Sequence, residues 1–186
     1  MYLSNFGIIL LSFKKVYEFK TMIYVKVIEK ETKDKGKGVF AAEFIPTGTL
    51  IWKLDKNAKR YSKDEYEKLP EIIKKDLYQE GGEFVLSNGY GESWNHSCDA
   101  NTWWTNDDEL SARRDIQIGE EVTYDYITGE IDPRIIYEWE CKCGSPKCRH
   151  HLKYTDIFET SLYEEYKGHL PKWIEKEIEF KRLKGL

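Results

Sequence analysis

The sequence predicts one mainly β domain with a few short helices, a fold of the α+β class. The chain has 186 residues, of which 40% are hydrophobic and 15% aromatic, enough for one well-packed domain and too few for two of ordinary size. Short segments rich in β-branched and aromatic residues recur between glycine and proline turns, and helical periodicity occurs in only two places. Short strands should therefore make up most of the core.

The first strand is expected at residues 23–28, which read Ile-Tyr-Val-Lys-Val-Ile and lead into the glycine turn Lys-Asp-Lys-Gly-Lys-Gly. Further strands are expected at residues 38–42, 49–52, 102–105 and 121–124. Turn residues stand between them, namely Pro46, Gly48, Asn106 and Gly119.

Helical signals occur after residue 61 and near the C-terminus. Ser62 and Glu65 have the spacing of a capping box, so a helix should begin at Ser62, and Pro70 should kink or split it. In the second segment, lysines lie largely off a face formed by four apolar residues: Leu170, Trp173, Ile174 and Ile178. We expect this helix to pack on its own domain; the alternative is a surface for a partner or a nucleic acid.

The N-terminal segment and the net charge exclude some classes of protein. The apolar run at residues 6–13 is too short to cross a bilayer, which takes about 20 residues, and it lacks the flanks of a secretory signal. Met22 precedes a clean strand pattern, so residues 1–22 are expected to be a dispensable leader or an extra strand. The formal net charge of -4 disfavours the binding of a phosphate backbone.

All four cysteines fit one zinc site. Cys141, Cys143 and Cys148 form a C-x-C-x4-C cluster around a Gly-Ser-Pro turn, and Cys98 lies alone upstream. Three thiolates on a tetrahedral ion need a fourth ligand, which is either Cys98 or one of the imidazoles of His150 and His151. Four thiolates leave no open position, so the zinc would be structural and would order the C-terminal segment. A disulfide framework is the alternative, which the size of the chain and the lack of an export signal disfavour.

Three other segments are weak signals when each is taken alone. Gly36-Lys37-Gly38 is an ordinary turn that lacks the remaining glycine of a dinucleotide fingerprint. The segment Asn95-His96-Ser97-Cys98-Asp99-Ala100-Asn101 lies between tryptophans and predicts a partly buried polar site, although a lone histidine is more often a core residue. In residues 119–126, Tyr124 and Tyr126 share one face of an extended chain, where they either pack in the core or line a cavity.

Because these segments occur together and in this order, the sequence resembles the SET-domain protein-lysine methyltransferases with a zinc-binding post-SET segment. The resemblance covers residues 23–152. It is carried by the glycine motif at residues 36–41, the Asn-His-Ser-Cys segment, the Gly-Glu-Glu…Asp-Tyr segment ending at Tyr126, and the cysteine cluster. It implies a β-clip-like fold in which the second and third segments meet through a pseudoknot. The chain would then divide into a SET domain (23–137), a post-SET zinc segment (138–152) and a C-terminal helical extension (153–186).

The resemblance also implies the roles of individual residues. Tyr126 and Tyr124 would be catalytic, and a hydroxyl at position 124 favours mono- or dimethylation over trimethylation. Cys98 would rank above the histidines and complete the zinc site of Cys141, Cys143 and Cys148. The methyl donor would be S-adenosylmethionine, bound by the following residues: Lys35, Gly36, Lys37, Gly38, Asn95, His96, Tyr126 and Trp139.

An aromatic slot suits this chemistry because the attacking lysine amine must be neutral. Deprotonating a lysine of pKa about 10.4 at pH 7 costs about 4.6 kcal/mol, and a dry channel beside a sulfonium charge lowers that pKa. Tyr78 or Phe84 is a candidate for the channel wall, although residues 81–92 match no family motif.

The expected partner is a protein or peptide lysine, which includes the lysines of histone tails, with no membrane and no direct nucleic-acid contact. One alternative is a catalytically inactive SET-like zinc module for protein interaction, and the other is a zinc-stabilised nucleic-acid binder. The presence of four active-site residues together argues against the inactive module: Asn95, His96, Tyr124 and Tyr126. Reduced thiols suit a cytoplasmic or nuclear location, and a secreted effector that acts in a host would carry the same motifs.

Overall fold

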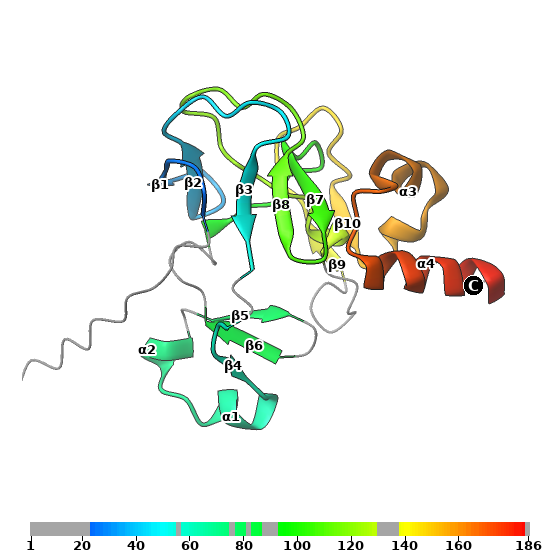
Figure 1. The fold of residues 1–186 in the computed structure, drawn as a ribbon, viewed down its shortest axis with the longest axis horizontal. Coiled ribbons are helices and arrows are strands. Elements are labelled where there is room, and N and C mark those ends of the chain that lie inside the picture. Colours follow the sequence, from blue (N-terminus) through cyan, green and yellow to red (C-terminus); the bar gives the residue numbers. More distant parts are fainter. Residues whose placement is uncertain are drawn as a thin grey trace, which may run out of the picture.

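The fold is described here from a computed structural model, which covers residues 23–54, 57–74, 77–80, 83–86, 93–129 and 138–184. The predicted leader at residues 1–22 and most of the unmatched stretch 81–92 lie outside the described residues. Strands predominate over short helices in the described part, as the sequence predicts (Figure 1).

Two small antiparallel sheets form the upper body of the molecule in Figure 1. One pairs β1 (Val27–Glu31) with β2 (Lys37–Ala41), and the other has the order β3-β8-β7, formed by Leu50–Lys53, Glu109–Ala112 and Thr102–Asn106. Apolar residues from both sheets and their connections bury one core: Val39, Ala41, Ile45, Ile51, Trp94, Ala112, Ile116 and Val122. Burial of these side chains supplies the main driving force for packing the sheets together.

Three predicted strands agree with the structure to within one residue at each end, and the other two do not. The strand predicted at residues 23–28 begins only at Val27, because Ile23 forms a single bridge to Trp52 of β3 instead of pairing with β2. The strand predicted at residues 121–124 is absent. Glu121 forms an isolated β-bridge with Phe40, and Tyr124 forms another with His96, so the segment does not pair continuously with either neighbour. The sequence prediction missed β8, which pairs with β3 and β7.

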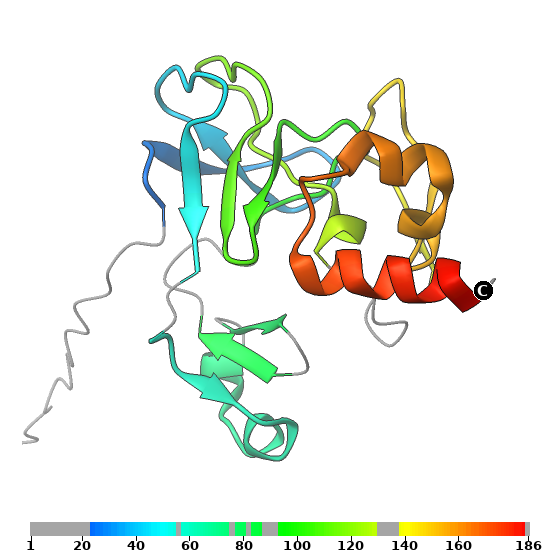
Figure 2. The same cartoon turned by 45° about the vertical axis from the view of Figure 1, so that its right-hand side comes forward.

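A second, smaller unit lies below the first in Figures 1 and 2. Its sheet has the order β4-β6-β5, formed by Arg60–Tyr61, Glu83–Leu86 and Leu77–Glu80, and its helices are α1 (Lys63–Glu67) and α2 (Glu71–Lys74). The predicted capping box is confirmed: the Ser62 hydroxyl accepts from the Glu65 amide, and the Glu65 carboxylate accepts from the Ser62 amide. The split at Pro70 is also confirmed, because Pro70 separates the two helices.

The C-terminal region packs against the main body through its own core (Figure 2). It contains β9 (Glu138–Glu140), β10 (His151–Lys153), the 3-10 turn η3 (Asp156–Phe158), α3 (Thr160–Tyr166) and α4 (Lys172–Lys184). Ile174 and Ile178 of α4 are fully buried, as their spacing predicts, but Trp173 is 45% exposed. Trp173 sits one position before Ile174 and therefore points about 100° away from the buried face.

The predicted meeting of the Asn-His segment with the segment ending at Tyr126 is confirmed. The Tyr124 amide donates to the Asn95 carbonyl at 3.3 Å, and the Ser97 amide donates to the Tyr124 carbonyl at 3.2 Å, in a parallel bridge. The Asn101 side chain adds two bonds, to the Thr123 amide and the Glu121 carbonyl. Tyr126 then begins the 3-10 turn η2 (Tyr126–Thr128).

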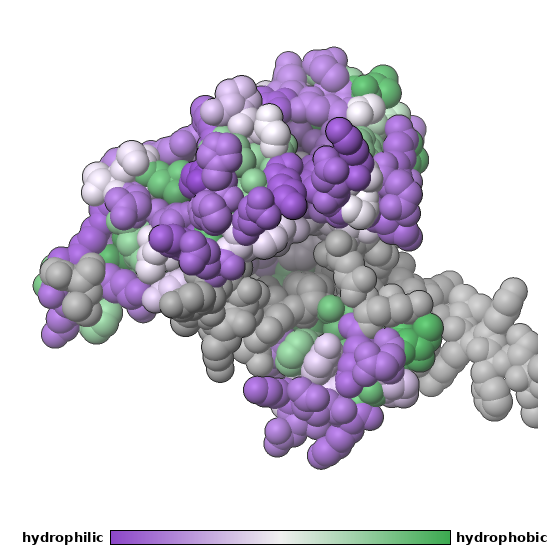
Figure 3. Space-filling view, turned by 180° about the vertical axis from the view of Figure 1, so that it is seen from behind, coloured by the Kyte–Doolittle hydropathy of each residue, from purple (hydrophilic) through white to green (hydrophobic). Residues whose placement is uncertain are grey.

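The surface seen from behind in Figure 3 is mostly hydrophilic, with hydrophobic residues in small separate groups. Among the described residues, no helix is long and apolar enough to cross a membrane.

Candidate functional site

A cavity of about 510 Å³ lies where the glycine turn, the crossing segments and β9 meet. Its size is within the range of small-molecule sites, about 300–1,000 Å³. Its lining combines aromatic rings, both signs of charge and an amide: Asp34, Lys35, Asn95, His96, Tyr126, Trp139, Glu140, Cys141, Lys142 and Cys143. Five residues predicted to bind a cofactor are therefore in one cavity, namely Lys35, Asn95, His96, Tyr126 and Trp139.

Tyr126 is held from several sides. Its hydroxyl donates to the Trp94 carbonyl at 2.7 Å, and its amide donates to His96 Nδ1 at 3.3 Å. Its ring stacks on Trp139, with centroids 5.5 Å apart, and lies 4.9 Å from the ring of Tyr124. Burial raises the pKa of Tyr126 to about 12, so the hydroxyl is protonated at neutral pH.

The side-chain contacts of Asn95, which lines the cavity, depend on the lack of a side chain at Gly38. The Asn95 side-chain amide donates to the Lys37 carbonyl at 2.9 Å and to Glu121 Oε1 at 2.7 Å, and Glu121 also forms an ion pair with Lys35. A Cβ on Gly38 would lie 2.6 Å from Glu121 Oε1 and 3.0 Å from Asn95 Nδ2. Only glycine leaves room for this polar arrangement.

Gly36 and Lys37, which precede Gly38, have different structural roles. Gly36 has a φ of 69°, which favours glycine in the tight turn between β1 and β2. The Lys37 ammonium points to Glu29, 2.6 Å away, and is not among the groups that line the cavity, so Lys37 contributes its backbone carbonyl.

His96 connects the cavity to the cysteines. Burial, with the nearby charges of Arg149 and Lys35, lowers the pKa of His96 to about 3, so the imidazole is neutral. Nδ1 accepts from the Tyr126 amide, which leaves the proton on Nε2. Nε2 lies 3.1 Å from Cys98 Sγ and can donate to it.

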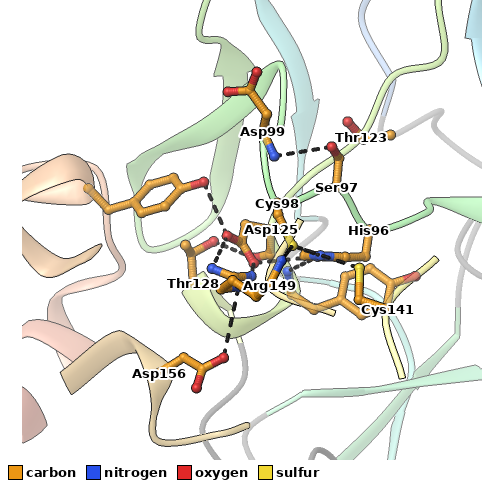
Figure 4. Close-up of polar contacts among 12 residues, drawn as sticks. His96, Ser97, Cys98, Asp99, Thr123, Asp125, Thr128, Cys141, Arg149 and Asp156 are labelled. Atoms are coloured by element: carbon orange, nitrogen blue, oxygen red, sulfur yellow. Dashed lines mark hydrogen bonds and ion pairs between the residues drawn. The ribbon is translucent and has the colours of Figure 1, made fainter. Parts of the chain in front are cut away.

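The cysteines converge although 43 residues separate Cys98 from Cys141, whose sulfur atoms are 3.7 Å apart (Figure 4). The ligand atoms of His96, Cys98, Cys141 and Cys143 all lie within 4.8 Å of one another. Cys148 is not one of these four, but it packs against the same cluster, and its Sγ lies 3.6 Å from the Cys141 carbonyl. All four cysteines are free, so the disulfide alternative is wrong.

This donor set fits a zinc ion. Burial raises the pKa of Cys98 to about 11 and also raises that of Cys141, so thiolates at these two positions need a compensating cation. Neither competing histidine belongs to the group of donors found among the described residues. His150 is in the left-handed region at φ 62°, and the exposed His151 lies 3.8 Å from Glu138.

Comparison with known proteins identifies the family. Residues 36–127 match the family model of the SET domain. These residues are a SET domain. The match ends one residue after Tyr126 and contains the glycine turn and both crossing segments.

Relatives of this SET domain are much longer proteins. The chain is 27% identical over 148 residues to a histone-lysine N-methyltransferase, H3 lysine-36 specific, of Debaryomyces hansenii, with 70% of this chain and 19% of that protein aligned. It is 39% identical over 72 residues to a histone-lysine N-methyltransferase of Arabidopsis thaliana, covering 35% of this chain and 6% of the relative. A variant-silencing SET domain-containing protein of Plasmodium falciparum is 30% identical over 155 residues, covering 69% and 6%. The chain thus spans less than a fifth of each relative.

Among solved structures, the chain is similar to a Plasmodium falciparum protein assigned to the histone methyltransferases. The two share 22% identity and a TM-score of 0.41, over 56% of this chain and 95% of that one. A likeness of this size does not bear on function.

Neither candidate for the wall of the lysine channel is placed beside the SET-domain cavity. The side chain of Tyr78 lies outside the described residues. Phe84 stacks on Tyr66 in the smaller unit, with ring centroids 3.8 Å apart, and does not line the cavity.

The sequence reasoning missed three residues behind the SET-domain site: Asp125, Arg149 and Tyr166. Arg149 donates to both carboxylate oxygens of the fully buried Asp125, at 2.9 and 2.6 Å, and the Tyr166 hydroxyl donates to Asp125 Oδ2 at 3.2 Å. Burial raises the pKa of Asp125, while these hydrogen bonds oppose the rise. Desolvation lowers the pKa of Arg149, but the bonds and charge of Asp125 outweigh it and raise that pKa. A bidentate pair of this kind fixes the distance and the orientation of the two groups.

Proposed function

We propose that this SET domain is an S-adenosylmethionine-dependent protein-lysine N-methyltransferase. The observation that carries the proposal is the position of Tyr126, whose hydroxyl is fixed by the Trp94 carbonyl while its ring stacks on Trp139 at the wall of the cavity. The SET-domain match and relatives named as histone-lysine methyltransferases support the same reaction class.

The cavity has groups that complement each part of S-adenosylmethionine. Trp139 offers an exposed aromatic face for the adenine. Lys35 and Asn95 are the candidates for the amino-acid portion, and the absence of a side chain at Gly38 lets Asn95 and Glu121 pack against the turn that carries Lys35. When bound, this cofactor supplies a methyl group activated by a positively charged sulfur.

The residues around Tyr126 would then prepare the lysine amine. Tyr126 lines the cavity, and the ring of Tyr124 lies behind it at 4.9 Å and packs against the main core. A lysine that reaches these rings would lose water, and its pKa would fall. Orientation supplies most of the catalysis in such an in-line attack, because the reacting atoms are held in place without an acid-base pair. The hydroxyl of Tyr124 narrows the slot, which favours mono- or dimethylation.

We propose a structural zinc ion bound by Cys98, Cys141, Cys143 and Cys148. Although His96 lies as close to the thiols as a ligand would, its Nε2 carries the proton and is therefore a donor to the Cys98 sulfur. Such a hydrogen bond orients a thiolate ligand from outside the coordination shell. The ion would tie the segment that carries Trp139 to the Asn-His segment.

A histone tail is the first substrate to test, because two of the relatives are named as histone-lysine N-methyltransferases. A nuclear or cytoplasmic location, where thiols stay reduced, agrees with the proposed zinc site.

The proposal is tested by incubating the purified chain with labelled S-adenosylmethionine and each recombinant core histone, with the Tyr126→Phe variant as control. We expect label on a histone lysine, identified by mass spectrometry, and a large loss of label with the variant. If the folded, zinc-loaded protein binds S-adenosylmethionine but labels no histone and no lysate protein, the inactive binding module is the correct interpretation.

A further inference from the structure

A buried ion pair lies behind the site and does not line the cavity (Figure 4). The Asp125 carboxylate has no exposed surface and accepts from both terminal nitrogens of Arg149. The Tyr166 hydroxyl donates to the same carboxylate. Arg113 in turn donates to the Tyr166 hydroxyl at 3.4 Å, so the network continues to an ion pair with Glu165.

The members of this network come from three separate parts of the chain. Asp125 immediately precedes Tyr126 and caps the turn η2, where the Thr128 amide and hydroxyl both donate to the Asp125 carbonyl, at 2.9 and 2.6 Å. Arg149 follows Cys148, and its amide lies 3.4 Å from Cys98 Sγ. Tyr166 ends helix α3 of the C-terminal region. The carboxylate therefore joins the Tyr126 turn, the cysteine segment and the C-terminal helices.

Stability alone gives a weak reason for burying such a pair, because apolar side chains of the same volume usually pack at least as well. What a bidentate guanidinium-carboxylate pair provides is fixed geometry, since two parallel bonds set both distance and plane. The Asp125 carboxylate, whose plane Arg149 fixes, lies beside His96. The His96 Nδ1 atom is 3.4 Å from Asp125 Oδ1 and accepts from the Tyr126 amide. Movement of the Asp125 side chain would therefore move two groups that line the cavity.

We propose that Asp125, Arg149 and Tyr166 are positioning residues for methyl transfer, which hold the Tyr126 turn in register with the cysteine segment. This inference rests on the proposed function. It goes further in making the C-terminal helix α3 a part of the machinery that orients Tyr126. The three side chains act through Tyr126 and His96 and touch neither substrate.

The test uses the full chain with two conservative variants. Arg149→Lys keeps the charge but loses the bidentate geometry, and Tyr166→Phe keeps the ring but loses one hydrogen bond. The matched control is Glu109→Gln, which breaks the Lys53–Glu109 ion pair of 2.6 Å between strands β8 and β3, away from the cavity. Thermal unfolding and bound zinc are measured first, and kinetics are measured where every variant is fully folded.

We expect Arg149→Lys to lower kcat by about tenfold or more and Tyr166→Phe by about threefold, with the KM for a peptide substrate and the zinc content nearly unchanged. A role limited to stability would leave kcat of the folded variants at the wild-type value. That result would overturn the proposal, as would an equal loss of kcat in Glu109→Gln. If Arg149→Lys does not fold, Tyr166→Phe alone decides between these outcomes.

Amide hydrogen exchange of residues 124–129 gives a second readout that does not require activity. In the protein without cofactor, Arg149→Lys should speed exchange in this segment by about tenfold, and Glu109→Gln should not change it. Unchanged exchange would overturn the positioning role. If exchange changes but the wild-type protein transfers no methyl group, the proposed function fails while the network still fixes the turn.

Discussion

Replacing Gly38 with alanine tests whether Asn95, which lines the cavity, is held in place by the lack of a side chain at position 38. The new Cβ would lie 2.6 Å from Glu121 Oε1 and 2.9 Å from Thr32 Cγ2. The φ of Gly38 is not in the left-handed region, so the backbone itself tolerates alanine and the collision is the main effect. Glu121 has little freedom to move away, because it pairs with Lys35 and accepts from Asn95.

The cost follows from these contacts. Inserting one carbon into a packed site costs about 1–3 kcal/mol, and the lower entropy of alanine in the unfolded chain returns about 0.5–1 kcal/mol. The net loss of about 1–2 kcal/mol should lower Tm by about 2–8 °C for a chain of this size. Displacement of the Asn95 amide should also weaken S-adenosylmethionine binding by about tenfold, which corresponds to about 1.4 kcal/mol.

Calorimetric titration with S-adenosylmethionine and thermal unfolding measure the two effects. Gly48→Ala is the control: Gly48 has a φ of 81° and no atom within 4 Å of an added Cβ, so it should lower Tm through backbone strain and leave cofactor affinity unchanged. In the double variant Gly38→Ala/Glu121→Ala the stability losses should be clearly less than additive, because the main collision is gone. Wild-type cofactor affinity in Gly38→Ala, or strict additivity in the double variant, would show that the collision with Glu121 is not the cause of the loss.

Three further predictions concern the tyrosines and the metal. Tyr126→Phe removes the hydrogen bond to the Trp94 carbonyl, and kcat should fall by about a hundredfold. The free energy of unfolding, measured by circular dichroism, should fall by only about 1 kcal/mol. A variant with wild-type kcat would contradict the catalytic role of Tyr126. Tyr124→Phe should move the product toward trimethyl-lysine in mass spectra of the modified peptide; an unchanged distribution would show that position 124 does not limit the product. Cys98→Ser should lower both zinc content, by elemental analysis, and methyl transfer, and retention of both would break the link between the two sites.

Local signals explain the parts of the fold that could be predicted. The Ser62–Glu65 capping box and the break at Pro70 depend on neighbours within one helical turn, and both are confirmed. The cysteine cluster is likewise local, since the turn at Gly144, with a φ of 73°, lets Cys148 pack against the same cluster as Cys141 and Cys143. Cys98 could be ranked above His150 and His151 as the fourth ligand only through the family resemblance, because its spacing does not indicate how far it lies from the cluster.

The missed features depend on partners far along the chain. Arg149 looks like an ordinary surface residue after a cysteine, and its partner Asp125 is 24 residues away. The position of Asp125 between two aromatic residues was the available signal, because a charge in an otherwise apolar segment is rarely buried without a partner. Residues 121–124 have strand composition but share their hydrogen bonds between two segments, which no periodicity can indicate.

The bond between the Tyr126 hydroxyl and the Trp94 carbonyl has a consequence for the polarity of the cavity wall. Trp94 is 7% exposed and belongs to the main core, so its carbonyl is an anchored acceptor. The hydroxyl hydrogen is committed to that carbonyl, and only the lone pairs of the oxygen are left for a ligand. The Tyr126 oxygen can therefore accept weak hydrogen bonds from electron-poor C–H groups, but it cannot donate a hydrogen bond to a ligand. This favours a methyl group on a cationic centre and disfavours an anion. The direction of one hydrogen bond thus gives the site a preference for the sign of charge.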